Sequence, residues 1–115
     1  MELEKSLVSG SMSLLVLKLL EDGDLYGYQM IAELRRRSDD TFRLKAGTLY
    51  PLLHSLEEKG FVTAYEQTAE SGKTRRYYHL TKQGHQALRE KETAWNAYAR
   101  AVGRVLKGGA CLAGA

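Results

Sequence analysis

The sequence has few of the residues that cross-link a chain or interrupt its secondary structure. Among its 115 residues there is one cysteine, Cys111, and one proline, Pro51. A single cysteine has no partner within the chain, which excludes an internal disulfide and a cysteine-based metal site in one chain. The longest apolar cluster, residues 12–20, is interrupted by Lys18 and is typical of a buried helix rather than of a membrane span. We expect no secretory signal, no contact with a membrane and a cytoplasmic location.

Patterns that support catalysis or metal binding are also missing. The three histidines, His54, His79 and His85, do not have metal-ligand spacing. No glycine-rich phosphate loop follows a strand. We therefore expect that the protein is not an enzyme and that it holds neither a cofactor nor a metal.

Acidic residues are absent from one long stretch of the chain. Five basic residues and no acid stand between positions 71 and 89, whereas the net charge of the whole chain is only +3, so the remainder carries −2. A basic segment on a slightly acidic body indicates an anionic partner that is met at one place. A solvated run of charges is the alternative. The five residues are Lys73, Arg75, Arg76, Lys82 and Arg89.

Length and apolar periodicity predict one small domain that begins with two helices. With 43% hydrophobic and 27% charged residues, the chain can bury a modest core. The first helix is expected over about residues 11–21 and should be buried on more than one face. The second is expected near residues 26–38, with Tyr28, Ile31 and Leu34 on one apolar stripe. Its three final arginines, residues 35–37, are favoured there by the helix dipole, with direct ligand contact as the alternative.

The only proline lies in the third predicted helix. Apolar residues at spacings of three and four indicate one buried face, and Gly60 is a natural stop. A proline in a helix interior costs about 3 kcal/mol. If the helix begins at Ala46 or Gly47, however, Pro51 falls near its first turn, where a backbone N–H has no partner inside the helix. The proline is then expected to mark a helix start.

The hydrophobic period changes from helical to alternating after Gly60. Two runs of strand formers flank a turn at residues 70–73, which predicts a two-stranded hairpin. In its second strand the alternation puts Tyr78 and Leu80 on one face and Arg75, Tyr77 and His79 on the other.

Thr81 is expected to cap a final helix that runs to about Lys107. The predicted fold class is therefore mainly α with a small β-hairpin wing. Three helices followed directly by a basic hairpin are the element order of a winged helix-turn-helix, here with a long C-terminal helix added.

In this arrangement the third helix can enter the major groove of DNA with its N-terminal residues at the base edges. Gly47 allows a close backbone approach, Thr48 and Tyr50 offer hydroxyls, and free N–H groups can bind a phosphate. Pro51 stiffens the turn at the point of contact.

Three motifs resemble the PadR family of transcriptional regulators: "LYGYQM", "GTLYPLLHSLEEKGFV" and "GKTRRYYHLTKQG". The resemblance covers about residues 14–84. It implies a cytoplasmic homodimeric repressor that binds an inverted-repeat operator and is released by a small-molecule effector. By this resemblance the DNA-binding positions fall on Gly47, Thr48, Tyr50 and Pro51 in the helix and on Lys73, Arg75, Arg76 and Tyr77 in the wing. For Tyr50 and Tyr77, an equally weighted alternative to DNA contact is that the ring packs within the protein.

The last helix carries an apolar seam of the kind that pairs with a second helix. Its residues follow one another at intervals of seven, three, four and three, close to a coiled-coil repeat. We expect a homodimer, and the alternative is that the helix folds back on its own domain. The predicted interface residues are Leu88, Trp95, Tyr98, Val102 and Val105.

Trp95 is the only tryptophan of the chain. Tryptophan is favoured as an anchor in protein interfaces, and we prefer that role. In a branch of the PadR family, a tryptophan at a similar point lines a drug-binding pore between subunits. This resemblance makes Trp95 a candidate ligand-binding residue for a small planar, lipophilic effector.

The expected organisation is a winged helix-turn-helix DNA-binding domain at residues 1–80, a C-terminal dimerisation helix at 81–107 and a flexible tail at 108–115. The expected function is sequence-specific binding of double-stranded DNA. The alternative is a winged-helix adaptor that binds protein instead of DNA, and the acid-free basic segment argues against it.

Overall fold

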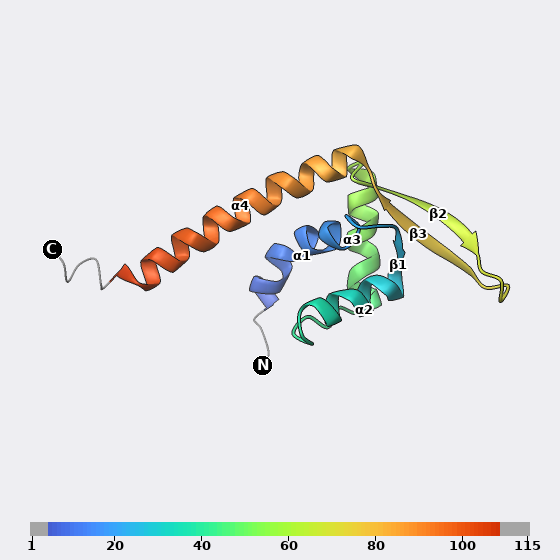
Figure 1. Ribbon diagram of the computed structural model, residues 1–115, viewed down its shortest axis with the longest axis horizontal. Helices are drawn as coiled ribbons and strands as arrows, with labels where there is room; N and C mark the ends of the chain where they lie inside the picture. Colours follow the sequence, from blue (N-terminus) through green and yellow to red (C-terminus); the bar gives the residue numbers. More distant parts are fainter. Residues whose placement is uncertain (1–4, 109–115) are drawn as a thin grey trace.

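The computed structural model describes residues 5–108, which form four helices and three strands. Figure 1 shows a small body from which the β2–β3 hairpin extends on one side and the end of α4 on the other. The predicted tail beyond residue 108, with Cys111, lies outside the described residues. The elements are α1 (Lys5–Leu19), β1 (Leu25–Tyr26), α2 (Gly27–Arg37), α3 (Ala46–Glu58), β2 (Val62–Thr68), β3 (Thr74–Leu80) and α4 (Lys82–Leu106).

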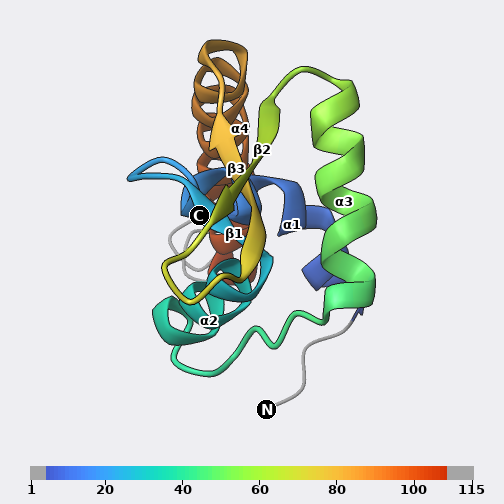
Figure 2. The same cartoon turned by 90° about the vertical axis from the view of Figure 1, so that its right-hand side faces the viewer.

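One hydrophobic core joins the four helices to the base of the hairpin. The helix α1 begins at Lys5, earlier than predicted, and its part from Met12 onward is buried on several faces, as expected. In α3, residues at spacings of three and four turn inward, and Figure 2 shows this helix standing beside the sheet. The most deeply buried side chains are Val16, Leu17, Met30, Leu49, Leu53, Leu56, Val62 and Leu88.

Pro51 lies one turn deeper in α3 than the sequence suggested. The helix does begin at Ala46, but Pro51 is then its sixth residue and belongs to the second turn. The carbonyl of Gly47, four residues earlier, therefore loses the N–H partner that a helix normally provides. Gly47 is exposed, so water can reach this carbonyl and keep the cost low.

The sheet has one more strand than predicted. Its order is β1-β3-β2, all antiparallel, with Tyr77 of β3 paired to Tyr26 on one side and to Tyr65 on the other. The two residues of β1 are too few to show a period, which is why the sequence did not reveal this strand. The predicted faces of β3 are confirmed, since Tyr78 and Leu80 are buried.

The connection between the sheet and α4 is closely packed around Thr81 and Gly84. The predicted cap is present: the Thr81 hydroxyl accepts a hydrogen bond from the N–H of Gly84 at 3.0 Å and donates to the carbonyl of Gly60 at 2.7 Å. A Cβ atom at Gly84 would lie 2.1 Å from the backbone oxygen of Phe61. Only glycine allows α4 to start this close to β2.

Two apolar residues lie elsewhere than predicted. Leu88 is only 1% exposed and packs in the core of the chain, because the first turns of α4 lie against α1 and β3. We therefore assign Leu88 to the core and not to the seam. Conversely, Tyr28 is 70% exposed, although the sequence placed it on one stripe with Ile31 and Leu34. Leu34 is buried as expected, and α2 buries Gly27 and Met30 together with it.

The Gly84 contact predicts a clear loss of stability. Gly84→Ala should lower the free energy of unfolding by about 1–3 kcal/mol, because backbone would have to move. Gly47→Ala is the matched control: nothing lies within 4 Å of its Cβ position, so the added helix former should stabilise by about 0.5–1 kcal/mol. Urea unfolding at equal protein concentration measures both. Equal stability of the two variants would contradict the close packing of Gly84 against the backbone of Phe61.

Candidate nucleic-acid interface

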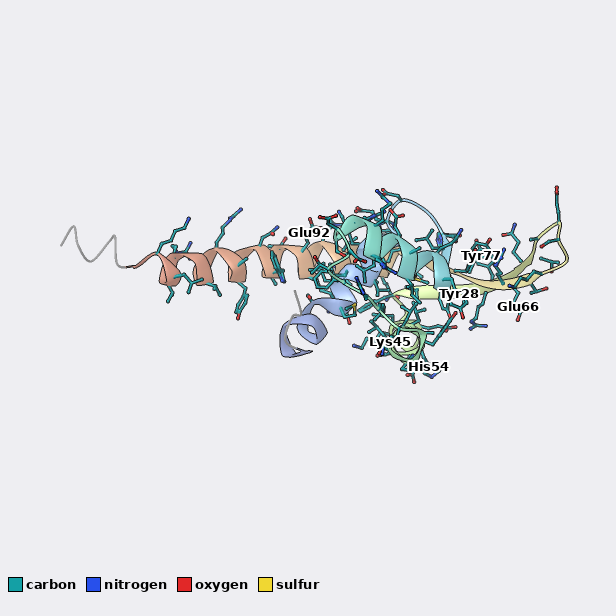
Figure 3. All side chains as sticks on the ribbon, turned by 90° about the horizontal axis from the view of Figure 1, so that it is seen from below. Tyr28, Lys45, His54, Glu66, Tyr77 and Glu92 are labelled. Carbon is teal, nitrogen blue, oxygen red and sulfur yellow. The ribbon has the colours of Figure 1, made fainter. Side chains whose placement is uncertain are left out.

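A groove of about 330 Å³ lies between the start of α2, the first turns of α3 and the wing. Four of the eight residues predicted to bind DNA line it, and they come from α3 and from the β2–β3 hairpin. Figure 3 labels Tyr28 near the start of α2, Lys45 immediately before α3 and His54 on α3. The sequence did not predict the contribution of α2. The groove is lined by Tyr26, Gly27, Tyr28, Tyr50, Lys73, Thr74, Arg75 and Arg76.

The first turn of α3 is open to an anion. Gly47 and Thr48 are exposed, as predicted for positions that face a ligand. No side chain caps the helix at Lys45, and no acidic residue stands in its first turn. The positive end of the helix dipole therefore meets solvent without a negative partner from the described chain.

Tyr50 is packed against the protein on one side and exposed on the other. The hydroxyl end of its ring packs on Gly27, where any side chain would collide with the phenol, yet the residue is 42% exposed. Burial, together with the neighbouring Tyr78 and Tyr28, raises the pKa of the Tyr50 hydroxyl. Tyr50 is thus packed at one edge and accessible to a partner in the groove.

Tyr77 is held among other aromatic rings on the outer face of the wing. It stacks on Tyr65 with ring centroids 5.7 Å apart and makes a T-shaped contact with Tyr26 at a centroid distance of 5.4 Å. The guanidinium of Arg75 lies 4.6 Å from the centroid of the Tyr26 ring. The packing role of Tyr77 is therefore evident, and this cluster in turn supports Arg75.

The two neighbouring arginines of β3 differ in their surroundings. No carboxylate within residues 5–108 forms an ion pair with Arg75. Arg76, on the other face, lies 3.4 Å from a carboxylate oxygen of Glu57 in α3 and stands opposite Glu66 in the register of the hairpin. The sequence showed two equivalent basic residues, whereas the structure leaves the charge of Arg75 more available to a partner.

Asp24 fastens both strands of the wing to the body. The Tyr65 hydroxyl donates to one of its oxygens at 2.6 Å, and Nδ1 of His79 lies 2.8 Å from the other. Burial opposes ionisation of Asp24, but the hydrogen bonds from Tyr65 and His79 outweigh it and lower the pKa of the carboxyl. The partners are 41 and 55 residues away in the chain, so no local pattern could have revealed them.

The arginines at the end of α2 pair with acids of their own neighbourhood. Arg36 and Arg37 both bind Glu33, and they lower the pKa of its carboxyl to about 2. Arg35 pairs with Asp40. These ion pairs favour the interpretation of the three arginines as helix-end cations over direct ligand contact.

The seam predicted on α4 is exposed along its outer part. Figure 1 shows this end of the helix away from the other elements. The exposed fractions of Trp95, Tyr98, Val102 and Val105 range from 38% to 79%. Leu106, which the periodicity did not single out, extends the same stripe and is 80% exposed.

Two kinds of feature are absent from the described part of the chain. No three histidine, cysteine, aspartate or glutamate side chains in it gather as they would around a metal ion. Among its helices, none has the length and apolar character needed to cross a membrane.

The order of helices, hairpin and added helix is that of a winged helix-turn-helix protein. Residues 16–90 match the transcriptional regulator PadR-like family, and the chain belongs to this family. It is thus a transcriptional regulator, as the sequence motifs suggested. It is 38% identical to the transcriptional regulator Rv3488 of Mycobacterium tuberculosis over 81 residues, which are 70% of this chain and 72% of the relative.

Solved structures agree with this assignment. A PadR family transcriptional regulator from Eggerthella lenta is 34% identical and superimposes with a TM-score of 0.77, covering 88% of this chain and 86% of its own. A transcriptional regulator from Clostridium thermocellum reaches a TM-score of 0.80 at 28% identity, covering 87% of this chain and 97% of its own.

The unequal arginines predict unequal effects on DNA binding. Arg75→Ala should weaken binding to duplexes of any sequence by a similar factor and reduce the salt slope by about one unit, because a phosphate contact is lost. Arg76→Ala should change the slope less, since Glu57 already neutralises part of that charge. Fluorescence anisotropy with random duplex DNA at several salt concentrations measures both. The assignment is wrong if Arg76→Ala has the larger slope change.

Proposed function

We propose that the chain is a homodimeric repressor that binds an inverted-repeat DNA operator in the cytoplasm and is released by a small-molecule effector. The observation that carries the DNA-binding part is the groove between α3 and the wing. Arg75, to which the described residues offer no carboxylate partner, lines this groove, and the start of α3 has no side-chain cap. In this proposal residues 1–80 bind DNA and residues 81–107 join the two protomers.

The recognition step assigns separate roles to α3 and to the wing. Gly47, Thr48 and Tyr50 meet base edges and nearby phosphates in the major groove, while Pro51 stiffens the turn behind them. Lys73 and Arg75 meet the backbone, which fixes the register of the protein without reading sequence. The open space around Gly47 supports this placement, because the protein itself makes no use of the missing side chain.

A gel-shift experiment tests the DNA-binding function itself. The DNA upstream of the protein's own gene is searched for an inverted repeat, and that duplex is compared with a scrambled one at two salt concentrations. Preferential, salt-sensitive binding of the repeat supports the repressor. A protein that binds neither duplex would instead favour the adaptor that binds another protein.

The dimer part of the proposal rests on the exposed stripe of α4. Trp95, Tyr98, Val102 and Val105 form an apolar surface that one protomer leaves in water. A two-fold pairing along it would present two copies of α3 to the two halves of a symmetric operator. The basic residues Arg100 and Arg104 lie on the opposite side of the helix, where they do not oppose such pairing.

The effector part of the proposal rests on Trp95. Half-exposed at 49%, its ring is open to a partner on the outer part of α4. If two such rings form a slot between protomers, a planar guest gains about 0.5–1.5 kcal/mol per ring pair beyond burial. It acts as an inducer only if it prefers the dimer geometry that binds DNA poorly.

Charges placed in the stripe should separate the protomers. The double variant Tyr98→Glu/Val102→Glu puts two carboxylates into an apolar surface, which costs several kcal/mol unless they are paired. We expect monomers that no longer bind the operator, as measured by sedimentation and gel shift. The exchange of exposed Arg100→Glu on the opposite side is the control and should leave the dimer intact. A dimeric double variant would move the interface to another surface.

The tryptophan should report directly on an effector. Because Trp95 is the only tryptophan, its fluorescence can be followed without interference. A planar cationic dye should quench it in a saturable way, and the quenching should weaken when operator DNA is present. Absence of saturable quenching by a varied panel of planar compounds would leave Trp95 as an interface anchor.

A further inference from the structure

Gly27, the first residue of α2, lies directly against the ring of Tyr50 in α3. We propose that Gly27 is a positioning residue: its missing side chain sets the direction of the Tyr50 phenol in the groove and thereby contributes to the choice of DNA sequence. The inference rests on the proposed function, in which Tyr50 meets DNA. It assigns to the start of α2 a role that involves no contact of Gly27 with the DNA itself.

The distances leave no room for even the smallest side chain at this position. A Cβ atom at Gly27 would lie 2.2 Å from the Tyr50 hydroxyl oxygen and 2.7 Å from Cζ. Ordinary van der Waals contact begins at 3.4 Å. Any other residue would therefore force the hydroxyl to retreat by more than 1 Å, whereas a functional side chain has to be held within about 0.5 Å of its working position.

The tyrosine ring would move, and not the backbone, because the backbones of α2 and α3 are both held in place by buried side chains. Leu49 and Leu53, which flank Tyr50 on α3, are fully buried, and so is Met30 on α2. The atoms that a Cβ would meet are the far end of a side chain that can rotate. At Gly84, in contrast, the obstacle includes a backbone carbonyl. A substitution at Gly27 should thus redirect Tyr50 rather than unfold the protein.

The redirected phenol would leave its place in the groove. Tyr50 lines it together with Gly27, Tyr28 and the two wing arginines, so its side chain lies among residues assigned to DNA binding. Neither the spacing nor the composition of the "LYGYQM" segment shows that its glycine serves α3. The contact joins residues that are 23 positions apart and belong to different helices.

The test compares Gly27→Ala with wild type, each with and without Tyr50→Ala. Gly27→Ala should weaken operator binding about tenfold, the loss expected for one well-placed contact, and should change binding to random DNA less than about twofold. In the Tyr50→Ala background the same substitution should have almost no further effect on operator binding, because the ring through which Gly27 acts is absent. An equal loss with and without Tyr50 would overturn the proposal.

A measurement without DNA separates this inference from the proposed function. The protein is labelled with 3-fluorotyrosine, and the ¹⁹F resonance of Tyr50 is identified by its absence in Tyr50→Phe. Gly27→Ala should shift that resonance, while Thr48→Ala, the control in the same helix turn, should leave it in place. An unmoved resonance in Gly27→Ala refutes the positioning role. If Gly27→Ala shifts the resonance but the wild-type protein does not prefer the operator over random DNA, the proposed DNA recognition is refuted and the contact between Gly27 and Tyr50 is still supported.

Discussion

The burial of the leucine face of α3 is the interaction on which the proposed site depends. Leu49, Leu53 and Leu56 are almost completely removed from water. Each contributes about 1.5–3 kcal/mol by burial, so together they exceed the roughly 3 kcal/mol that a proline costs inside a helix. The chain can therefore carry Pro51 in the second turn of α3 without losing the helix.

This anchoring also decides which part of α3 faces outward. With its leucines fixed in the core, the helix can present only its first turn and one edge, where Gly47, Thr48 and Tyr50 lie. Asp24 ties the two wing strands to the same body through Tyr65 and His79. The two elements that border the groove are thus each held by the body of the protein, and the ion pair between Arg76 and Glu57 joins them to one another.

Much of this architecture could be predicted from the sequence because it is encoded locally. The helices, the hairpin, the Thr81 cap and the faces of β3 follow from periodicity and from residue preferences over a few positions. Long-range contacts could not be predicted in this way. The partners of Asp24, the pairing of β1 and the ion pair between Arg76 and Glu57 all join segments that are distant in the chain.

Two errors have the same physical origin. Tyr28 and Leu88 both have the right spacing for the face to which they were assigned, but a helical period cannot say which of two neighbouring faces meets the core. For α2 the answer depends on Gly27, which lets the helix approach Tyr50 of α3 closely. For α4 it depends on Gly84, which brings the first turns against the sheet and buries Leu88.

The uninterrupted course of α4 has a mechanical consequence. A helix of 25 residues is about 37 Å long and contains no proline that would let it bend. Its first turns are locked to the body through Thr81, Gly84 and Leu88, whereas its other end stands free (Figure 1). It therefore moves as a rigid rod: if α4 tilts by about 5° about its first turns, its free end is displaced by roughly 3 Å. Any partner that binds the outer part of α4 therefore influences the orientation of the whole winged body.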